Sequence, residues 1–145
     1  MSNKLIEPSK NCSRCSRLKN FRTENKKKYP SWFNAPVPSI LNINSELLIV
    51  GLAPGITGAN RTGRPFTGDH AGLILFSTLK KFGFSRGLYK ENGFDSLELD
   101  NCSITNAVRC VPPKNLPNIN EIKNCEIFLQ TTIKEHKNLK LIIDL

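Results

Sequence analysis

The chain has 145 residues, of which 39% are hydrophobic and 23% charged, a composition typical of one globular domain. No apolar run reaches the roughly 18 residues that a membrane-spanning helix needs. The first residues lack the apolar stretch of a secretory signal, so we expect a cytoplasmic protein without membrane contact. The net charge is +9, and residues 1–30 supply most of it. This basic block suits a nucleic-acid backbone, and a solvated basic arm is the alternative.

The patterns along the chain predict three helices and three buried strands in alternation. Continuous apolar runs such as LLIVG are typical of strands buried on both faces of a parallel sheet, and helical spacing of apolar residues indicates the helices. We expect helices at 12–28, 70–83 and 119–136, and strands at 47–51, 102–108 and 140–145. The alternation predicts an α/β fold, a three-layer sandwich with a mainly parallel central sheet. Residues 1–30 would form a basic arm and residues 45–145 the core of a single domain, 1–145.

Two further expectations concern the last helix and the histidines. Apolar spacing predicts that the helix at 119–136 buries one face, made of Ile119, Ile122, Phe128, Leu129 and Ile133. The two histidines, His70 and His136, are expected to be ordinary surface or helix residues.

Five cysteines, an odd number, argue against a disulfide framework. Cys12 and Cys15 form a C-x-x-C pair that can reach one metal centre from a tight turn. Cys110 follows a predicted strand and Cys125 lies on the next helix. Thiolate quartets of this kind hold either Zn²⁺ or an iron–sulfur cluster, and spacing alone does not separate the two. Cys102, at the start of a strand, fits a small buried hydrophobic residue instead.

The Gly-rich loop at 52–69 is the expected ligand site, because ligands of open α/β sheets bind beyond the carboxyl ends of the strands. Its glycines let the backbone approach a ligand closely. Arg61 and Arg64 can meet phosphate, and Phe66 can stack on a base. The loop has neither the P-loop ending nor the dinucleotide-binding spacing of glycines.

Two polar side chains accompany this loop. Asp69 either caps the following helix or serves the ligand site. Asn106, at the end of a predicted strand, either organises a turn or offers its donor and acceptor to the edge of a base such as uracil.

The strings GLAPGITGANRTGRPFTGD, ITNAVRCVPPKN and CSRCSRL together resemble the uracil-DNA glycosylase superfamily, most closely its family-5, B-type enzymes, over nearly the whole chain. The resemblance implies hydrolysis of the N-glycosidic bond of uracil, or of other deaminated bases, in DNA after base flipping. It implies that Asp69 and Asn106 serve catalysis and that Arg61 and Arg64 contact DNA. The implied uracil-binding residues are Leu52, Ala53, Pro54, Gly55, Phe66 and Asn106. The implied ligands of a [4Fe–4S] cluster are Cys12, Cys15, Cys110 and Cys125.

The family continues beyond its third strand to a second motif that contains a histidine, and neither His70 nor His136 matches that motif. The chain is therefore expected to be the N-terminal portion of a monomeric glycosylase, with a sheet incomplete at the C-terminus and weak stability or activity in isolation. A non-catalytic iron–sulfur protein that binds nucleic acid is the first alternative. A zinc-stabilised module without enzymatic activity is the second.

Overall fold

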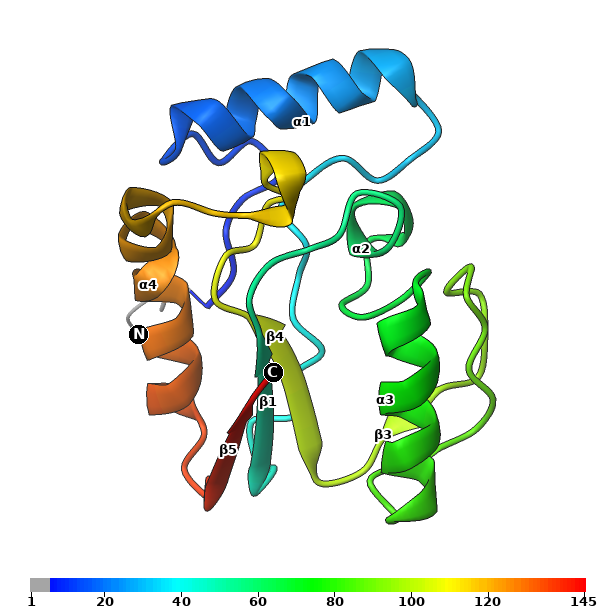
Figure 1. Ribbon diagram of the computed structural model, residues 1–145. Helices are drawn as coiled ribbons and strands as arrows, with labels where there is room; N and C mark the ends of the chain where they lie inside the picture. Colours follow the sequence, from blue (N-terminus) through cyan, green and yellow to red (C-terminus); the bar gives the residue numbers. More distant parts are fainter. Residues whose placement is uncertain (1–5) are drawn as a thin grey trace.

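The computed structural model describes residues 6–145 and confirms the predicted α/β fold (Figure 1). The central sheet has three parallel strands in the order β4-β1-β5. They are β1 (Leu47–Gly51), β4 (Cys102–Asn106) and β5 (Leu141–Asp144). All residues of β1 and β4 are buried, whereas every residue of β5 is exposed at one edge of the sheet. Residues 1–5, the start of the predicted basic arm, lie outside the described residues.

Helices cover both faces of this sheet. The helices are α1 (Ser16–Lys28), α2 (Ala59–Thr62), α3 (His70–Lys81) and α4 (Ile119–Glu135). In Figure 1, α3 and α4 lie on opposite sides of the strands and α1 crosses above their carboxyl ends. Phe76 and Leu79 of α3 pack on β1 and β4, and Phe128 of α4 packs against Leu18 of α1. No helix within residues 6–145 is long and apolar enough to cross a membrane.

Four short elements were not predicted. Helix α2 lies inside the Gly-rich loop and ends at Gly63, whose φ of +79° favours glycine. Strands β2 (Ser85–Arg86) and β3 (Glu98–Leu99) form an antiparallel pair, and a 3₁₀ turn, η1 (Pro113–Asn115), lies in the Pro-rich loop. Each of them spans only about one period of a hydrophobic pattern, so apolar periodicity carries no signal for them.

The buried face predicted for the last helix is wrong. Ile119 is 70% exposed, Ile122 and Ile133 are also exposed, and Leu129 is half-buried, so only Phe128 of the expected five is buried. The buried face instead consists of Glu121, Cys125, Phe128 and Thr132. Two of these residues are polar, yet each has partners. The Glu121 carboxylate accepts from Arg17 and from the backbone N–H of Asn118, and the Thr132 hydroxyl donates to the Phe128 carbonyl at 2.8 Å.

His136 is not a surface residue, which corrects the second expectation. It ends α4 and is only 4% exposed. Its Nδ1 lies 2.6 Å from the Thr132 carbonyl oxygen and its Nε2 lies 2.9 Å from the Ser103 hydroxyl on β4. The imidazole therefore fastens the end of α4 to the sheet. His70, by contrast, is the exposed first residue of α3, as expected.

Candidate functional site

A cavity of about 360 Å³ opens at the carboxyl ends of β1 and β4. It brings together residues that the sequence analysis assigned to base binding and catalysis: Ala53, Pro54, Gly55, Phe66, Asp69 and Asn106. Leu52 is not among the lining residues. Its side chain is 45% exposed, and its carbonyl oxygen accepts a hydrogen bond from the Val108 N–H at 2.9 Å. The cavity is also lined by Asn115 of η1, which the sequence analysis did not single out.

The floor of the cavity is set by close contacts around Gly51. This residue ends β1 and pairs in register with Asn106 on β4. A Cβ atom at position 51 would lie 2.4 Å from Asn106 Oδ1 and 2.7 Å from Phe66 Cζ. Only glycine therefore allows the amide of Asn106 and the ring of Phe66 to meet over the end of β1.

The backbone at Phe66 is held in an uncommon conformation. Its φ is +52°, in the left-handed region that a bulky residue rarely adopts. The Phe66 carbonyl oxygen lies against the first turn of α3, where a Cβ atom on Gly72 would come within 1.8 Å of it. The constraint from α3 fixes the ring toward the cavity, and strained residues of this kind concentrate at functional sites.

The side-chain amide of Asn106 lines the cavity without a protein partner. Asn106 is 4% exposed, and within residues 6–145 its side chain has no hydrogen-bond partner, whereas its backbone carbonyl oxygen accepts from Arg109 Nε at 3.0 Å. The amide lies at the wall of the open cavity. The group is thus positioned to give both its donor and its acceptor to a bound molecule.

Asp69 caps the helix and also lines the cavity, and its role toward a ligand stays a prediction. One carboxylate oxygen caps α3 by accepting from the Gly72 N–H at 3.2 Å. The other faces the Gly-rich loop, where a Cβ atom on Gly58 would lie 2.6 Å from it. The carboxylate therefore joins the start of α3 to the wall of the cavity.

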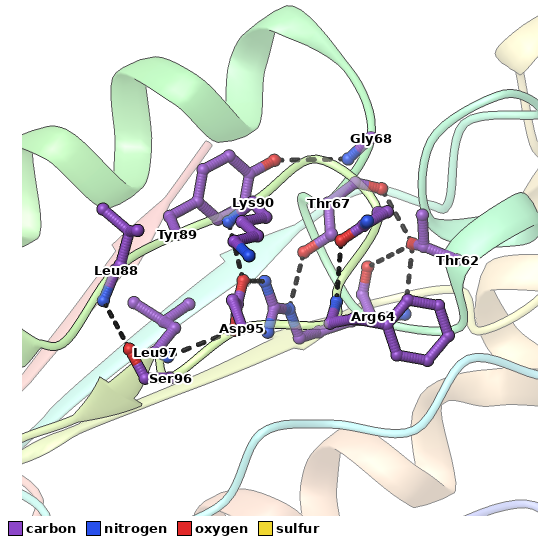
Figure 2. Close-up of polar contacts among 12 residues, drawn as sticks. Thr62, Arg64, Thr67, Gly68, Leu88, Tyr89, Lys90, Asp95, Ser96 and Leu97 are labelled. Carbon is purple, nitrogen blue, oxygen red and sulfur yellow. Dashed lines mark hydrogen bonds and ion pairs between the residues drawn. The ribbon is translucent and has the colours of Figure 1, made fainter.

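Arg64 forms a structural ion pair that the sequence did not predict (Figure 2). Its guanidinium makes two parallel hydrogen bonds to Asp95, at 2.8 and 2.7 Å, and its Nε donates to the Thr67 hydroxyl at 2.8 Å. The hydrogen bonds from Arg64 lower the pKa of Asp95 to about 2. Arg61 Nε donates to the Thr57 carbonyl at 2.7 Å. Both arginines thus brace the loop, and their contact with DNA phosphate stays a prediction.

The four cysteines predicted as cluster ligands, Cys12, Cys15, Cys110 and Cys125, line one small cavity of about 10 Å³. It lies between the start of α1, the residues that follow β4, and α4. Polar donors point at two of the sulfur atoms. Arg22 Nη1 lies 2.9 Å from Cys110 Sγ, and Asn124 Nδ2 lies 3.7 Å from Cys15 Sγ. Burial raises the pKa of the Cys110 thiol to about 11. Cys102 lies elsewhere, fully buried in the α3 core cluster, as expected for a small hydrophobic residue.

The side chains around this cavity supply sulfur donors in an apolar setting. Within residues 6–145 no three or more His, Cys, Asp or Glu side chains are arranged to hold one metal ion. The donor set is nevertheless soft, consisting of thiols with apolar neighbours such as Leu18, Val108 and Phe128. Thiolates with hydrogen-bond donors at their sulfur atoms are the ligands that iron–sulfur clusters use.

The sequence model of the uracil DNA glycosylase superfamily matches residues 38–145. The chain belongs to this superfamily. It is 41% identical over 128 residues to a type-5 uracil-DNA glycosylase of Pyrobaculum aerophilum, covering 86% of this chain and 57% of that protein. It is 42% identical over 120 residues to the type-5 uracil-DNA glycosylase of Thermus thermophilus, covering 79% and 54%. A type-4 enzyme of Pyrobaculum aerophilum is 35% identical over 127 residues, covering 87% and 51%.

The motif resemblance drawn from the sequence is thus confirmed at the level of the superfamily. The chain spans about half the length of the curated relatives that it matches. The matched region of the superfamily contains β1, the Gly-rich loop, α3, β4 and α4, so every wall of the 360 Å³ cavity lies within it.

Sequence reasoning missed Arg109, which contacts the backbone of Asn106, one of the lining residues of the 360 Å³ cavity. This arginine is fully buried, donates to the Asn106 carbonyl oxygen and forms an ion pair with Glu7. Glu7 in turn accepts from the backbone N–H of Ser39 at 3.2 Å. Arg109 therefore ties the N-terminal segment to the residue that carries the free amide. The available signal was its position directly before Cys110, next to a strand that was expected to be buried. An arginine buried there requires a paired carboxylate.

Proposed function

We propose that this protein hydrolyses the N-glycosidic bond of uracil in DNA and that the 360 Å³ cavity receives the flipped base. The observation that carries the proposal is the buried, unpartnered amide of Asn106 beside the ring of Phe66. Uracil offers an acceptor at O4 and a donor at N3, which complement the two ends of an amide. The names of the relatives, which are uracil-DNA glycosylases, support the same substrate.

The geometry suggests how the residues of the cavity divide the work. Phe66 stacks on the base once it has left the duplex or strand, and Asn106 binds its pyrimidine edge. Cleavage leaves negative charge on the departing uracil, which fixed donors stabilise without reorganising. We assign this role to the amide of Asn106 and to the backbone N–H groups of Ala53 and Gly55, since Pro54 between them has none. Asp69 holds the loop against α3 and places negative charge near the developing positive sugar.

We further propose that Cys12, Cys15, Cys110 and Cys125 hold a [4Fe–4S] cluster. These four thiols would ligate the iron atoms of the cluster, and the resemblance to the family-5 enzymes favours this group over zinc. Arg22 would stabilise the thiolate of Cys110 through its hydrogen bond and also holds the loop at Cys12 by donating to its carbonyl oxygen at 2.9 Å. The cluster would supply a covalent link between distant segments and no catalytic step. Uracil-containing DNA as substrate, a monomeric state and a cytoplasmic location stay predictions.

A single-turnover assay with a uracil-containing single-stranded oligonucleotide tests the activity. We expect slow release of uracil by the chain, and a loss of at least about 100-fold in the Asn106→Ala variant, since one donor to a developing anion is worth that much. The Asn101→Ala variant is the matched control, because Asn101 is an exposed asparagine that contacts Glu46 at the other end of β4. Its rate should equal that of the unaltered chain. DNA binding by the folded chain without any release of uracil would instead favour the non-catalytic alternative.

A further inference from the structure

A second groove, of about 430 Å³, lies on the other side of α2 from the base cavity. It is lined by Trp32 and Phe33 of the segment after α1, by Arg61 and Thr62 of α2, and by Asn92 and Phe94 of a turn. The base cavity is lined by Thr57, Gly58 and Ala59, at the start of the same short helix. The two hollows are therefore neighbours, separated by little more than one helical turn.

Trp32 is held rigidly at this groove. Its ring stacks on Tyr29 with 3.9 Å between centroids and 8° between planes, and Lys28 Nζ lies 5.3 Å from the Tyr29 ring centroid. The backbone on its C-terminal side is pinned to α2, because the Phe33 N–H donates to the Arg61 carbonyl at 3.1 Å. A flat molecule that stacks on Trp32 would extend an existing aromatic stack and would order no flexible side chain.

Phe94 faces this groove from a turn that is also fixed. Its side chain is 82% exposed, the highest value among the exposed large hydrophobic residues of the described chain. Its N–H donates to Asn92 Oδ1 at 2.9 Å, and the next residue, Asp95, is anchored by Arg64 (Figure 2). Because the turn is braced, Phe94 presents its ring to the groove without ordering of the backbone on binding.

Arg61 lines the groove, and Lys28 lies over the Tyr29 ring on which Trp32 stacks. Lys26, Lys27 and Lys28 form the exposed last turn of α1, directly before the segment that carries Trp32. Asp95, the carboxylate nearest to Phe94 in sequence, is neutralised by its ion pair and its side chain is only 1% exposed. Aromatic rings next to cations that form no ion pair within residues 6–145 are the combination that binds single-stranded nucleic acid, through base stacking and phosphate contacts.

We propose that this groove binds unpaired bases of a single nucleic-acid strand, with Trp32 and Phe94 as stacking platforms and Lys28 as a phosphate contact. A duplex cannot bind in this way, because each of its bases is stacked on its neighbours and presents no free face to Trp32 or Phe94. The path of the strand rests on the proposed function: a strand whose flipped uracil occupies the base cavity would run from that cavity across α2. Nucleotides flanking the target would then occupy the groove.

Trp32 is the only tryptophan of the chain, so its fluorescence reports the groove directly. We expect titration with an oligothymidylate that lacks uracil to quench this fluorescence, and a duplex of the same length to leave it nearly unchanged. The Phe94→Ala variant should bind the oligothymidylate roughly 5- to 140-fold more weakly, as expected for the loss of one stacked base. Phe82→Ala is the matched control, because Phe82 is also an exposed phenylalanine, 67%, at the end of α3, and lies outside the groove.

Any of the following results would overturn the proposal: no binding of oligothymidylate, binding measured by anisotropy without quenching, or equal affinities of the Phe94→Ala and Phe82→Ala variants. Equal quenching by duplex would also contradict it, since that indicates phosphate contact alone. The outcome is independent of catalysis. Quenching and a Phe94 effect in a chain that releases no uracil would support the groove and refute the proposed activity, whereas uracil release without quenching would refute only the groove.

Discussion

At the scale of single residues, Gly51 determines whether the base cavity exists. We predict that Gly51→Ala lowers the rate of uracil release by about 100-fold, comparable to the loss of a donor to a developing anion, because its Cβ would displace Asn106 and Phe66 together. Single-turnover kinetics and thermal unfolding would measure activity and stability on the same sample.

Gly83→Ala provides the control for this substitution. A Cβ atom at Gly83 meets nothing within 4 Å, but its φ of +80° makes alanine strained, at about 1 kcal/mol. This variant should lose stability and keep its activity, whereas the Gly51 variant should lose activity beyond any loss of stability. Equal activities of the two variants would show that the contacts around Gly51 do not shape the site.

The ion pair between Arg64 and Asp95 makes stability depend on acid pH. The pKa of Asp95 is about 2 in the folded protein and near 3.9 in an unfolded chain, so its contribution is complete above pH 4 and is lost as the pH falls toward 2. We predict that Asp95→Asn lowers the free energy of unfolding by about 2 kcal/mol at pH 7 and that the difference shrinks below pH 4. Asp100→Asn, which alters an exposed ion pair with Arg86, should change the free energy of unfolding by less than about 1 kcal/mol. Urea unfolding at a series of pH values distinguishes the two variants, and a constant difference from pH 7 to 2 would contradict the assignment.

At the scale of elements, the sequence predicted the major helices and strands well, because each follows a long apolar period or run. The register of β1 against β4, which sets Gly51 beside Asn106, was not predictable, because strand pairing depends on contacts between residues about 50 positions apart. The prediction of the buried face of α4 was wrong for a different reason. Polar residues such as Glu121 are buried there with partners from other elements, Arg17 among them, and no local pattern encodes such partners.

The observed face of α4 yields a direct stability test. We predict that Phe128→Ala lowers the free energy of unfolding by about 3–5 kcal/mol, because its ring is 2% exposed within the cluster that contains Leu18. Ile119→Ala on the 70% exposed opposite side should change it by less than about 0.5 kcal/mol. Chemical denaturation would compare the two. A large effect at Ile119 would instead restore the face that apolar spacing suggests.

At the scale of the whole molecule, the cysteine quartet joins segments that the sheet alone does not hold. Cys12 and Cys15 precede α1, Cys110 follows β4 and Cys125 lies on α4, so a cluster there would fasten α1 over the carboxyl ends of the strands. Arg22 and Glu121 add polar contacts to the same corner, but these contacts do not replace a covalent link. The base cavity draws its lining from the Gly-rich loop, α3, β4 and η1, and uses no residue of α1.

We therefore predict that the variant with Cys12 and Cys15 both changed to Ser loses visible absorption and bound iron and loses hydrogen-exchange protection in α1 and the first turns of α4. Protection in β1 and β4 should persist, because their packing against α3 depends on Phe76 and Leu79 rather than on the cysteines. Cys102→Ala, which removes a thiol from the α3 core, should keep the iron and the protection of α1. Zinc in place of iron in the unaltered chain would refute the cluster. Full protection of α1 in the double variant would refute its structural role, because the apolar contact of Leu18 would then suffice to hold the helix.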